Sequence, residues 1–343
     1  MSTLPVHTGL DYHQGSIQVC VLDDAGRQLL NRSCRNDVID VAQAIQSHGQ
    51  AQSVAIESCC GAADFAESLH AATGWSITLA HPGYVNRMKL NPDKTDFADA
   101  RLLADLSRVG YIPKVWLAPK EIRELRSLVR RRQSCVNQRK ATKLQLTSLL
   151  RTRRLVAPND VGTRWTRSWM RWIRNVEVAT NDRWLIDELL ADLEHLSTRI
   201  SRVEAYLTQV THDDRVIAFL KTLPSIGDVT AWVIRAEIAS VHRFRTGKQL
   251  SRFCGVSPRN CSSGERVADS GLIRAGNPNL KTVVIQAAQR LRRHHPRWSS
   301  FSERLLKAGK PMNVVVAAVA NRWVRWLFHR MKEFEATMQK ELN

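Results

Sequence analysis

Residues 6–33 read VHTGLDYHQGSIQVCVLDDAGRQLLNRS and decide how the fold begins. The segments VHTGLD, SIQVCVL and RQLLNRS have the composition of short strands, and the turn signals HQG and DDAG separate them. Strands joined by such tight turns pair as antiparallel neighbours. We therefore predict a three-stranded antiparallel sheet in which Asp11 ends the first strand.

The next part of the chain predicts helices that alternate with strands. Its segments are a helix over about 37–47, the strand SVAIES (53–58), the helix DFAESLHAA (64–72), the strand SITLA (76–80) and a helix over about 84–90. The segment KTDFADARLLADLSRVG (94–110) has apolar residues at helical spacing, which leaves Asp96 and Asp99 on one helical face. This order of elements is expected of a ribonuclease-H-like α/β domain.

Four acids in this region suggest chemistry: Asp11, Glu57, Asp96 and Asp99. Each alone has a structural explanation, because an Asp at a strand end often forms a turn and an Asp near a helix start caps the helix or favours its dipole. As a set in this order they indicate a metal site, because like-charged acids on adjacent turns repel one another unless a cation lies between them. Acids gathered inside a basic protein suggest metal ions acting on phosphates.

The charge of the chain favours a polyanionic partner. Its 343 residues include 51 Lys and Arg but only 32 Asp and Glu, which gives a formal net charge of +19 and a pI near 10.2. The excess is concentrated in residues 119–174, whose acids are Glu121, Glu124 and Asp160. Nucleic acid is the natural ligand of such a protein, and a membrane surface fits poorly because the arginines are spread too widely.

Length and cysteine content set further bounds. Hydrophobic residues make up 43% of the chain, enough for the cores of two or three compact units. The seven cysteines include no CxxC spacing, so neither a disulfide framework nor a zinc site is expected. No run approaches the ~18 apolar residues of a membrane span. We expect a soluble protein of the reducing cytoplasm.

Two long helices are predicted in the middle of the chain. The first covers about 121–154 and the second about 182–210, where apolar residues recur every three or four positions as in a coiled-coil seam. Such helices would form either an antiparallel hairpin or a dimerising stalk. Basic residues of the first helix are expected to contact nucleic-acid phosphates, with a solvated helical face as the alternative: Arg130, Arg131, Arg132, Arg139, Lys140 and Lys143.

The segment between these helices interleaves aromatic and basic residues. Trp165, Trp169 and Trp172 fall on one helical stripe, and they alternate with Arg164, Arg167, Arg171 and Arg174. Burial of this stripe is one reading. Stacking of the rings on unpaired bases, with the arginines on phosphates, is the other.

The last part of the chain, from about Asp213, is predicted to be helical with two notable turns. The turn LPSIG (223–227) resembles the hairpin of a helix-hairpin-helix, in which Gly227 and the following helix N-terminus would meet a phosphate; a plain packing turn is equally consistent. The later stretch SPRNCSSGERVADSGLIRAGNPN (257–279) is polar and non-helical. Stretches of this composition serve as surface linkers or present reactive hydroxyl groups.

Several motifs together resemble one known family. Asp11 and Glu57 are followed by KTDFADARLLA (94–104), LPSIGDVTA (223–231), FCGVSPRNCSSG (253–264) and IRAGNPNLK (273–281). In this order they resemble the transposases of the insertion-sequence 110/1111 group, the DEDD recombinases. The similarity spans nearly the whole chain.

The resemblance implies an architecture and a reaction. It implies a RuvC-like, ribonuclease-H-like DEDD domain over 1–113, a basic helix and coiled-coil region over 114–212, and a mainly helical C-terminal transposase domain over 213–343 that carries a serine loop. Members recombine donor and target DNA under the guidance of a structured non-coding RNA. Carried over by motif, Asp11, Glu57, Asp96 and Asp99 would bind Mg²⁺ and Ser263 would be the nucleophile, with Ser262 as its nearest rival and Ser270 a distant one.

Three functions compete at this stage. The first is the serine recombinase, which is expected to be a dimer or tetramer because its acids and serine lie far apart in sequence. The second is a RuvC-type metal-dependent nuclease that uses water instead of serine. The third is a non-catalytic nucleic-acid-binding scaffold whose acids only cap helices.

Overall fold

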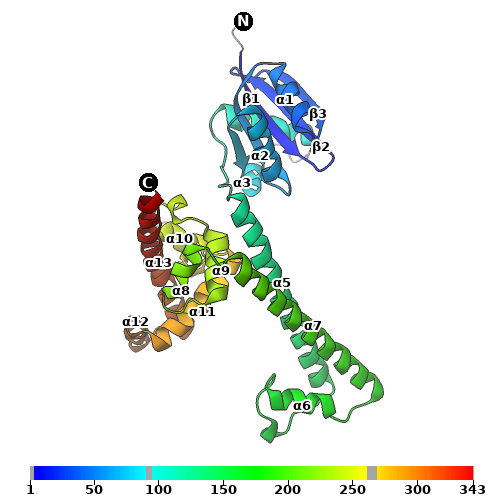
Figure 1. Cartoon of the computed structure of the whole chain (residues 1–343), viewed down its shortest axis with the longest axis vertical. Helices are drawn as coiled ribbons and strands as arrows, with labels where there is room; N and C mark the ends of the chain where they lie inside the picture. The colour runs from blue at the N-terminus through cyan, green and yellow to red at the C-terminus, as the bar shows by residue number, and fades with distance from the viewer. Residues whose placement is uncertain (1–3, 90–94, 261–268, 343) are drawn as a thin grey trace. The chain divides into compact units, whose positions relative to one another are not determined.

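The computed structural model describes residues 4–89, 95–260 and 269–342. It divides into two compact units, Met1–Leu117 and Ala118–Asn343 (Figure 1). The first combines a sheet with helices, and the second is mostly helical, which confirms the predicted mixture of an α/β part and a helical part. The three-region division at residues 113 and 212 stays a prediction.

The first unit is built on a five-stranded mixed sheet. Its strands are β1 (Pro5–Tyr12), β2 (Ser16–Asp23), β3 (Gln28–Arg35), β4 (Gln50–Glu57) and β5 (Ile77–Ala80), in the spatial order β3-β2-β1-β4-β5. Strands β1, β2 and β3 are antiparallel, as predicted, whereas β4 runs parallel to both β1 and β5. Because Leu10 of β1 pairs with Ile56 of β4, Asp11 and Glu57 end neighbouring strands at the same edge.

Helices cover both faces of this sheet. They are α1 (Val38–Gln46), α2 (Ala62–Thr73), α3 (Pro82–Met88) and α4 (Asp96–Arg108). Alternate residues of β2 divide between the faces: Val19 and Val21 pack with α1 and α2, whereas Cys20 and Leu22 pack with α4. Helix α4 lies so close to β1 that a Cβ atom on Gly9 would stand 2.1 Å from the carbonyl oxygen of Ala100.

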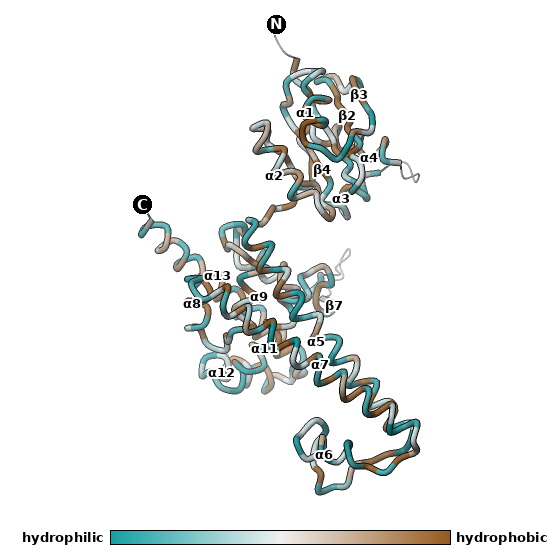
Figure 2. Tube along the Cα trace, turned by 45° about the vertical axis from the view of Figure 1, so that its right-hand side comes forward, coloured by the Kyte–Doolittle hydropathy of each residue, from teal (hydrophilic) through white to brown (hydrophobic). Residues whose placement is uncertain are grey.

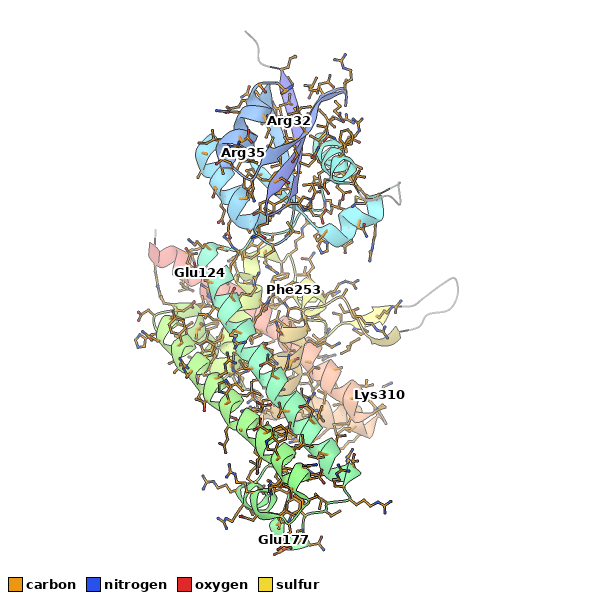
Figure 3. The ribbon with its side chains drawn as sticks, turned by 90° about the vertical axis from the view of Figure 1, so that its right-hand side faces the viewer. Arg32, Arg35, Glu124, Glu177, Phe253 and Lys310 are labelled. Carbon is orange, nitrogen blue, oxygen red and sulfur yellow. The ribbon has the colours of Figure 1, made fainter. Side chains whose placement is uncertain are left out.

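The second unit contains an antiparallel pair of long helices, α5 (Lys120–Thr152) and α7 (Thr180–Val210). Arg132 pairs with Glu204 and Arg153 with Asp182, so the end of α5 meets the start of α7. Figure 3 shows the two helices side by side, and Figure 2 shows hydrophilic and hydrophobic stretches alternating along both. The chain forms the hairpin that was one of the two predicted arrangements. The coiled coil expected there stays a prediction.

The two helices are joined by the short helices η1 (Asn159–Val161) and α6 (Arg167–Asn175). Trp169 is buried there against Leu146 and Leu150 of α5 and Ile186 of α7, with Trp165 and Trp172 partly buried beside it. The tryptophan stripe therefore packs the tip of the hairpin, which agrees with the burial reading. One predicted seam residue of α7, Val210, is instead 47% exposed at the end of the helix.

The remaining elements form a helical core with one small hairpin. They are α8 (Arg215–Thr222), α9 (Asp228–Ile238), η2 (Val241–Arg243), α10 (Gly247–Phe253), β6 (Pro258–Asn260), β7 (Asp269–Leu272), α11 (Pro278–His294), α12 (Pro296–Lys307) and α13 (Met312–Leu342). Residues Leu125 and Val129 of α5 share the core of this group, and Trp323 of α13 lies fully buried in it. The antiparallel strands β6 and β7 were not predicted from the polar composition of their segment. Among the described helices, none combines the length and apolarity that crossing a membrane requires.

Candidate active site

Asp11 and the first turn of α4 meet at one edge of the N-terminal sheet. Thr95 caps α4 by accepting a hydrogen bond from the backbone N–H of Ala98, so Asp96 and Asp99 both lie in its first turn. The imidazole Nε2 of His13 is 3.3 Å from Oδ2 of Asp11 and 3.3 Å from Oδ1 of Asp96. Asp11, His13 and Asp96 each offer an atom to a group that spans no more than 4.8 Å, a separation suited to one metal ion.

Asp99 is the most buried of the acids and has a cationic partner. Its carboxylate Oδ1 is 2.6 Å from Nζ of Lys89, and the two side chains are only 6% and 17% exposed. Lys89 follows α3 directly. No sequence signal marks this pair, because Lys89 belongs to no recognised motif and reaches Asp99 only through the packing of α3 and α4 against the same sheet face.

Asp11 carries the electrostatic signature of a crowded acidic site. Burial raises the pKa of its carboxyl above the usual value, and the charges of Asp96 and Asp99 raise it further, although His13 acts in the opposite direction through its charge and hydrogen bond. The combination of like charges and incomplete compensation favours binding of a further cation. His13 directly follows β1 and comes two residues after Asp11, the spacing that places side chains on one face of an extended chain.

Glu57 lies at the end of β4, the parallel neighbour of β1. The pKa of the Cys59 thiol is raised mainly by burial, and the charges of Glu57 and Asp11 raise it further. The structure thus brings Asp11, Asp96 and Asp99 together and sets Glu57 on the adjacent strand end. All four sequence-predicted acids belong to the same edge of the first unit.

The predicted nucleophile, Ser263, and its rival Ser262 lie outside the described residues. The chain on either side of them is described and converges. Strands β6 and β7 pair through Pro258 with Leu272 and Asn260 with Asp269, and the backbone N–H of Asn277 donates a 2.7 Å hydrogen bond to the carbonyl of Phe253. Ser270 belongs to β7.

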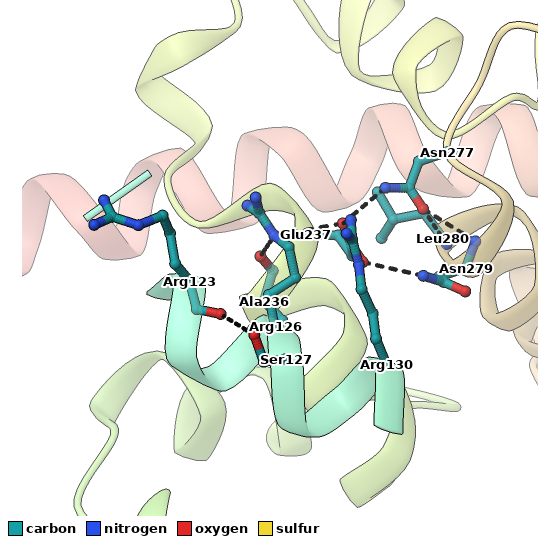
Figure 4. Close-up of polar contacts among 9 residues, drawn as sticks. All are labelled: Arg123, Arg126, Ser127, Arg130, Ala236, Glu237, Asn277, Asn279 and Leu280. Carbon is teal, nitrogen blue, oxygen red and sulfur yellow. Dashed lines mark hydrogen bonds and ion pairs between the residues drawn. The ribbon is translucent and has the colours of Figure 1, made fainter. Parts of the chain in front are cut away.

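A buried carboxylate that the sequence analysis did not single out lies in the second unit (Figure 4). Glu237 of α9 is 2% exposed and contacts arginines of α5 together with two asparagines at the start of α11. We call Arg126, Arg130, Glu237, Asn277 and Asn279 the Glu237 cluster. Only the place of Glu237 among the mostly apolar residues at the end of α9, two residues after Arg235, could have marked it in the sequence.

The predicted nucleic-acid contacts on α5 fall into two groups. Arg130 pairs with Glu237, Arg132 with Glu204, and Arg139 donates a 3.4 Å hydrogen bond to Ser197, so these three fix α5 to its neighbours. Lys143 lies 4.6 Å from the ring centroid of Trp165. Arg131 and Lys140 are exposed, and no described residue forms an ion pair with either.

Basic residues also surround the hairpin tip and the α8–α9 turn. Arg167 and Arg171 line a cleft of about 510 Å³ with Trp165, and Arg164 lines a neighbouring one.

Gly227 caps α9 and is exposed, with open space where a Cβ would lie. The next residue, Asp228, pairs with Lys221 at 2.6 Å and adds a negative charge beside this helix start. The preceding Ser225 has a φ of 65°, the left-handed conformation in which the helix-hairpin-helix motif often has glycine.

Comparison with known proteins adds the family. A DEDD transposase model of the IS110 group matches residues 8–153, and a model described as "Transposase IS116/IS110/IS902 family" matches residues 217–303. The transposase for insertion sequence element IS1111A of Coxiella burnetii is 23% identical over 92% of this chain and 86% of its own length. A probable family 20 transposase of Pseudomonas aeruginosa is 27% identical over 80% of this chain and 82% of its own. The transposase for insertion sequence element IS1328 of Yersinia enterocolitica is 24% identical over 79% and 81%.

The two family matches fit the geometry described above. The first contains all four acids at the sheet edge, and the second contains the serine-bearing segment. Together they account for most of the chain, in the order that the motifs indicate. The chain belongs to the IS110/IS1111 group of insertion-sequence transposases, enzymes that cut and rejoin DNA.

Proposed function

We propose that this transposase recombines DNA through Ser263, assisted by metal ions that Asp11, Glu57, Asp96 and Asp99 hold. The observation that carries the proposal is the convergence of Asp11 from β1 and Asp96 from α4 within reach of one ion, with the charge of Asp99 near enough to help raise the pKa of Asp11. An acid cluster of this kind inside a chain of formal charge +19 suits phosphodiester chemistry.

The residues at this edge fit a divalent cation. Carboxylate oxygens are the ligands that Mg²⁺ prefers, and His13 offers an imidazole nitrogen beside Asp11 and Asp96. Mg²⁺ bound there would polarise the scissile phosphate and stabilise negative charge on the attacking or leaving oxygen. Asp11 would be ionised more readily beside such a cation, because the repulsion from Asp96 and Asp99 would be offset. Lys89 already balances the charge of Asp99.

The order of the strands supports a RuvC-like, ribonuclease-H-like fold for the first unit. An antiparallel β1–β2–β3 meander followed by parallel β4 and β5 is what we expected of that fold, with the acids at the ends of β1 and β4 and the start of α4. The boundaries 1–113, 114–212 and 213–343 and the coiled coil between α5 and α7 belong to the same proposal.

The proposed step is a transesterification. The Oγ of Ser263 forms a bond to the phosphorus of a DNA phosphodiester while the bond from phosphorus to a deoxyribose oxygen breaks. The serine hydroxyl gives up its proton, and the departing deoxyribose oxygen takes one up. The phosphoserine link preserves the energy of the phosphodiester, so the strands can be rejoined without a nucleotide cofactor. Ser262 is the nearest alternative nucleophile.

A structured guide RNA is the proposed second nucleic-acid partner. The resemblance to the DEDD recombinases supports it, as do the exposed basic residues Arg131 and Lys140 on α5, which can contact phosphates but cannot read sequence. Sequence choice would then be delegated to base pairing. Because the acids and the serine belong to different units of the chain, we also propose a dimer or tetramer in which one subunit's acids serve another's serine.

One experiment tests the reaction directly. The purified protein is incubated with Mg²⁺, its co-purifying RNA and donor DNA, and the products are separated by denaturing electrophoresis before mass spectrometry of any DNA-linked peptide. We expect a linked peptide that contains Ser263 and disappears in Ser263→Ala. Cleavage by Ser263→Ala without a covalent product would instead identify a water-using nuclease.

Two further variants separate the remaining alternatives. Asp11→Asn should abolish cleavage, whereas Asp105→Asn on the same unit, whose exposed carboxylate pairs with Arg108, should not. Full activity of Asp11→Asn would favour a scaffold whose acids only cap helices. Activity recovered on mixing Asp11→Asn with Ser263→Ala would support sites shared between subunits.

A further inference from the structure

The Glu237 cluster joins three helices through one buried carboxylate (Figure 4). Arg130 of α5 donates from Nε to Oε1 at 3.0 Å and from Nη2 to Oε2 at 3.1 Å, and Nε of Arg126 is 3.6 Å from Oε2. The side-chain amide of Asn277 donates to Oε2 at 2.8 Å and that of Asn279 to Oε1 at 3.1 Å. Burial alone would raise the pKa of Glu237, but the hydrogen bonds from Arg130, Asn279 and Asn277 and the charge of Arg130 lower it overall.

The asparagines of this cluster stand where the serine-bearing segment returns to the core. Asn277 caps α11 by accepting from the backbone N–H groups of Asn279 and Leu280. Gly276 lies against Gly255 so closely that a Cβ on Gly276 would be 2.2 Å from the Cα of Gly255. The residues before β6 and after β7 are therefore clamped together beside Glu237.

If Glu237 served only to balance charge, Arg126 and Arg130 would be sufficient partners for it. The side-chain amides of Asn277 and Asn279 carry no charge, yet both donate to Glu237. Their presence means that the acid fixes the position of this chain return relative to α5. A buried carboxylate with hydrogen bonds from both sides is a stiff connection, because moving either side leaves it unpaired.

We propose that Glu237 is a positioning residue, which fixes the paired strands β6 and β7, the described flanks of the segment that contains Ser263, relative to helix α5. This inference rests on the proposed role of Ser263. Glu237 would act through Asn277 on one side and Arg130 on the other.

The test compares three variants of the full chain. Glu237→Gln keeps the shape but removes the charge, and Asn277→Ser keeps a helix-capping residue while losing the amide that reaches Glu237. Glu204→Gln is the matched control, because Glu204 also pairs with an arginine of α5, whereas the described side chains of Asn277 and Asn279 donate to Glu237 and not to it. The single-turnover rate of DNA–protein adduct formation and the affinity for donor DNA are measured for each.

We expect Glu237→Gln and Asn277→Ser to slow adduct formation by roughly tenfold to a hundredfold, the cost of a misplaced reacting group, with near-normal DNA affinity. The double variant should be no slower than the worse single variant, because both act through one contact. Glu204→Gln should leave the rate within about twofold of the parent.

The outcomes distinguish this inference from the proposed function. No adduct with the unmodified protein would contradict the role of Ser263. A normal adduct with the unmodified protein and equally fast adducts with both variants would refute the positioning role. Affinity that falls as much as the rate would also refute it, and Asn277→Ser still decides the matter should Glu237→Gln fail to fold.

A second, independent surface lies between α12 and α13. Four guanidinium groups line a cleft of about 830 Å³ there, from Arg297 and Arg304 of α12 and Arg322 and Arg325 of α13. Phe301 lies between two of them, with its ring centroid 4.3 Å from the guanidinium of Arg322 and 5.4 Å from that of Arg304. Across the described ranges of the chain, no carboxylate forms an ion pair with any of the four.

We infer that this cleft binds the phosphodiester backbone of nucleic acid, because four uncompensated guanidinium groups around one cavity repel one another until an anion enters. The probes are a mixed-sequence DNA duplex and a structured RNA hairpin, each titrated at several salt concentrations. Arg304→Ala/Arg322→Ala should reduce the slope of log affinity against log salt by about 2 for at least one probe.

Arg330→Ala is the control on α13, because Arg330 already pairs with Glu333. It should leave the salt dependence close to that of the parent protein. A change with only one probe names the DNA or the RNA as the occupant. Unchanged slopes with both probes would refute the inference without touching the assignment of Ser263.

Discussion

Two acids of the candidate site should affect stability in opposite directions. Asp99→Asn removes one partner of the buried pair with Lys89, whose side chains are 6% and 17% exposed. Removing one partner of a buried ion pair lowers the free energy of unfolding by about 3–5 kcal/mol. Because Lys89 is partly exposed, we expect a loss at the lower end, about 3 kcal/mol. In a unit of 117 residues, about 4 °C of melting temperature corresponds to each kcal/mol, so the unit should melt about 12 °C lower.

Asp11→Asn should instead raise the melting temperature at pH 7 without metal. The pKa of Asp11 is raised in the folded state by burial and by Asp96 and Asp99, so the folded protein holds this proton more tightly than the unfolded chain does. The ionised carboxylate therefore destabilises the fold once the pH exceeds its folded pKa, and an asparagine removes that cost.

The assay is calorimetry of the full chain in EDTA and again in Mg²⁺. Mg²⁺ should raise the melting temperature of the parent protein, and both variants should lose most of that shift. Asp105→Asn is the control on α4, since its exposed pair with Arg108 should contribute at most about 1 kcal/mol. Equal stability of Asp99→Asn and Asp105→Asn would contradict the role of the Lys89–Asp99 pair, and a melting temperature of Asp11→Asn below that of the parent protein would contradict the cost of the ionised Asp11 carboxylate.

Three other predictions follow from the packing and the titration. Gly9→Ala should lower the stability of the first unit by at least about 3 kcal/mol in urea unfolding, because its Cβ would stand 2.1 Å from the oxygen of Ala100. Trp169→Ala should cost about 3–5 kcal/mol at the tip of the α5–α7 hairpin and speed amide hydrogen exchange there, whereas the exposed Arg167→Ala should do neither. In metal-free buffer the protonated Asp11 contributes to the free energy of unfolding at low pH, and this contribution should be lost as the pH rises through its raised pKa. Unfolding titrations of Asp11→Asn should lack this pH dependence.

The local features of the fold were readable in the sequence because they depend on neighbouring residues. Tight turns separated β1, β2 and β3, and helical spacing placed Asp96 and Asp99 in the first turn of α4. The apolar repeats predicted α5 and α7, and the buried stripe of α7 follows them as far as Leu207. Val210, the last residue of α7, departs from the pattern and is 47% exposed.

The small hairpin of β6 and β7 was missed for a physical reason. Its strands are short and polar, so neither alternation nor β-branched composition marks them, and they exist because residues before and after the segment are clamped together. Gly276 permits that close approach to Gly255, a requirement that the sequence cannot reveal without knowing what faces it.

The sequence by itself determined the family, the acids, and the elements that carry them, because motif order and local periodicity are encoded along the chain. Only the tertiary structure decided that parallel pairing of β1 and β4 sets Asp11 and Glu57 at one edge, and that the side chains of His13 and Lys89 lie among the acids. It alone also decided that Glu237 accepts hydrogen bonds from Arg130 and Asn277. The reason is that ion pairs and hydrogen bonds between residues distant in sequence depend on how helices pack against the sheet and one another. That packing is a property of the whole core, whereas strand and helix signals are local.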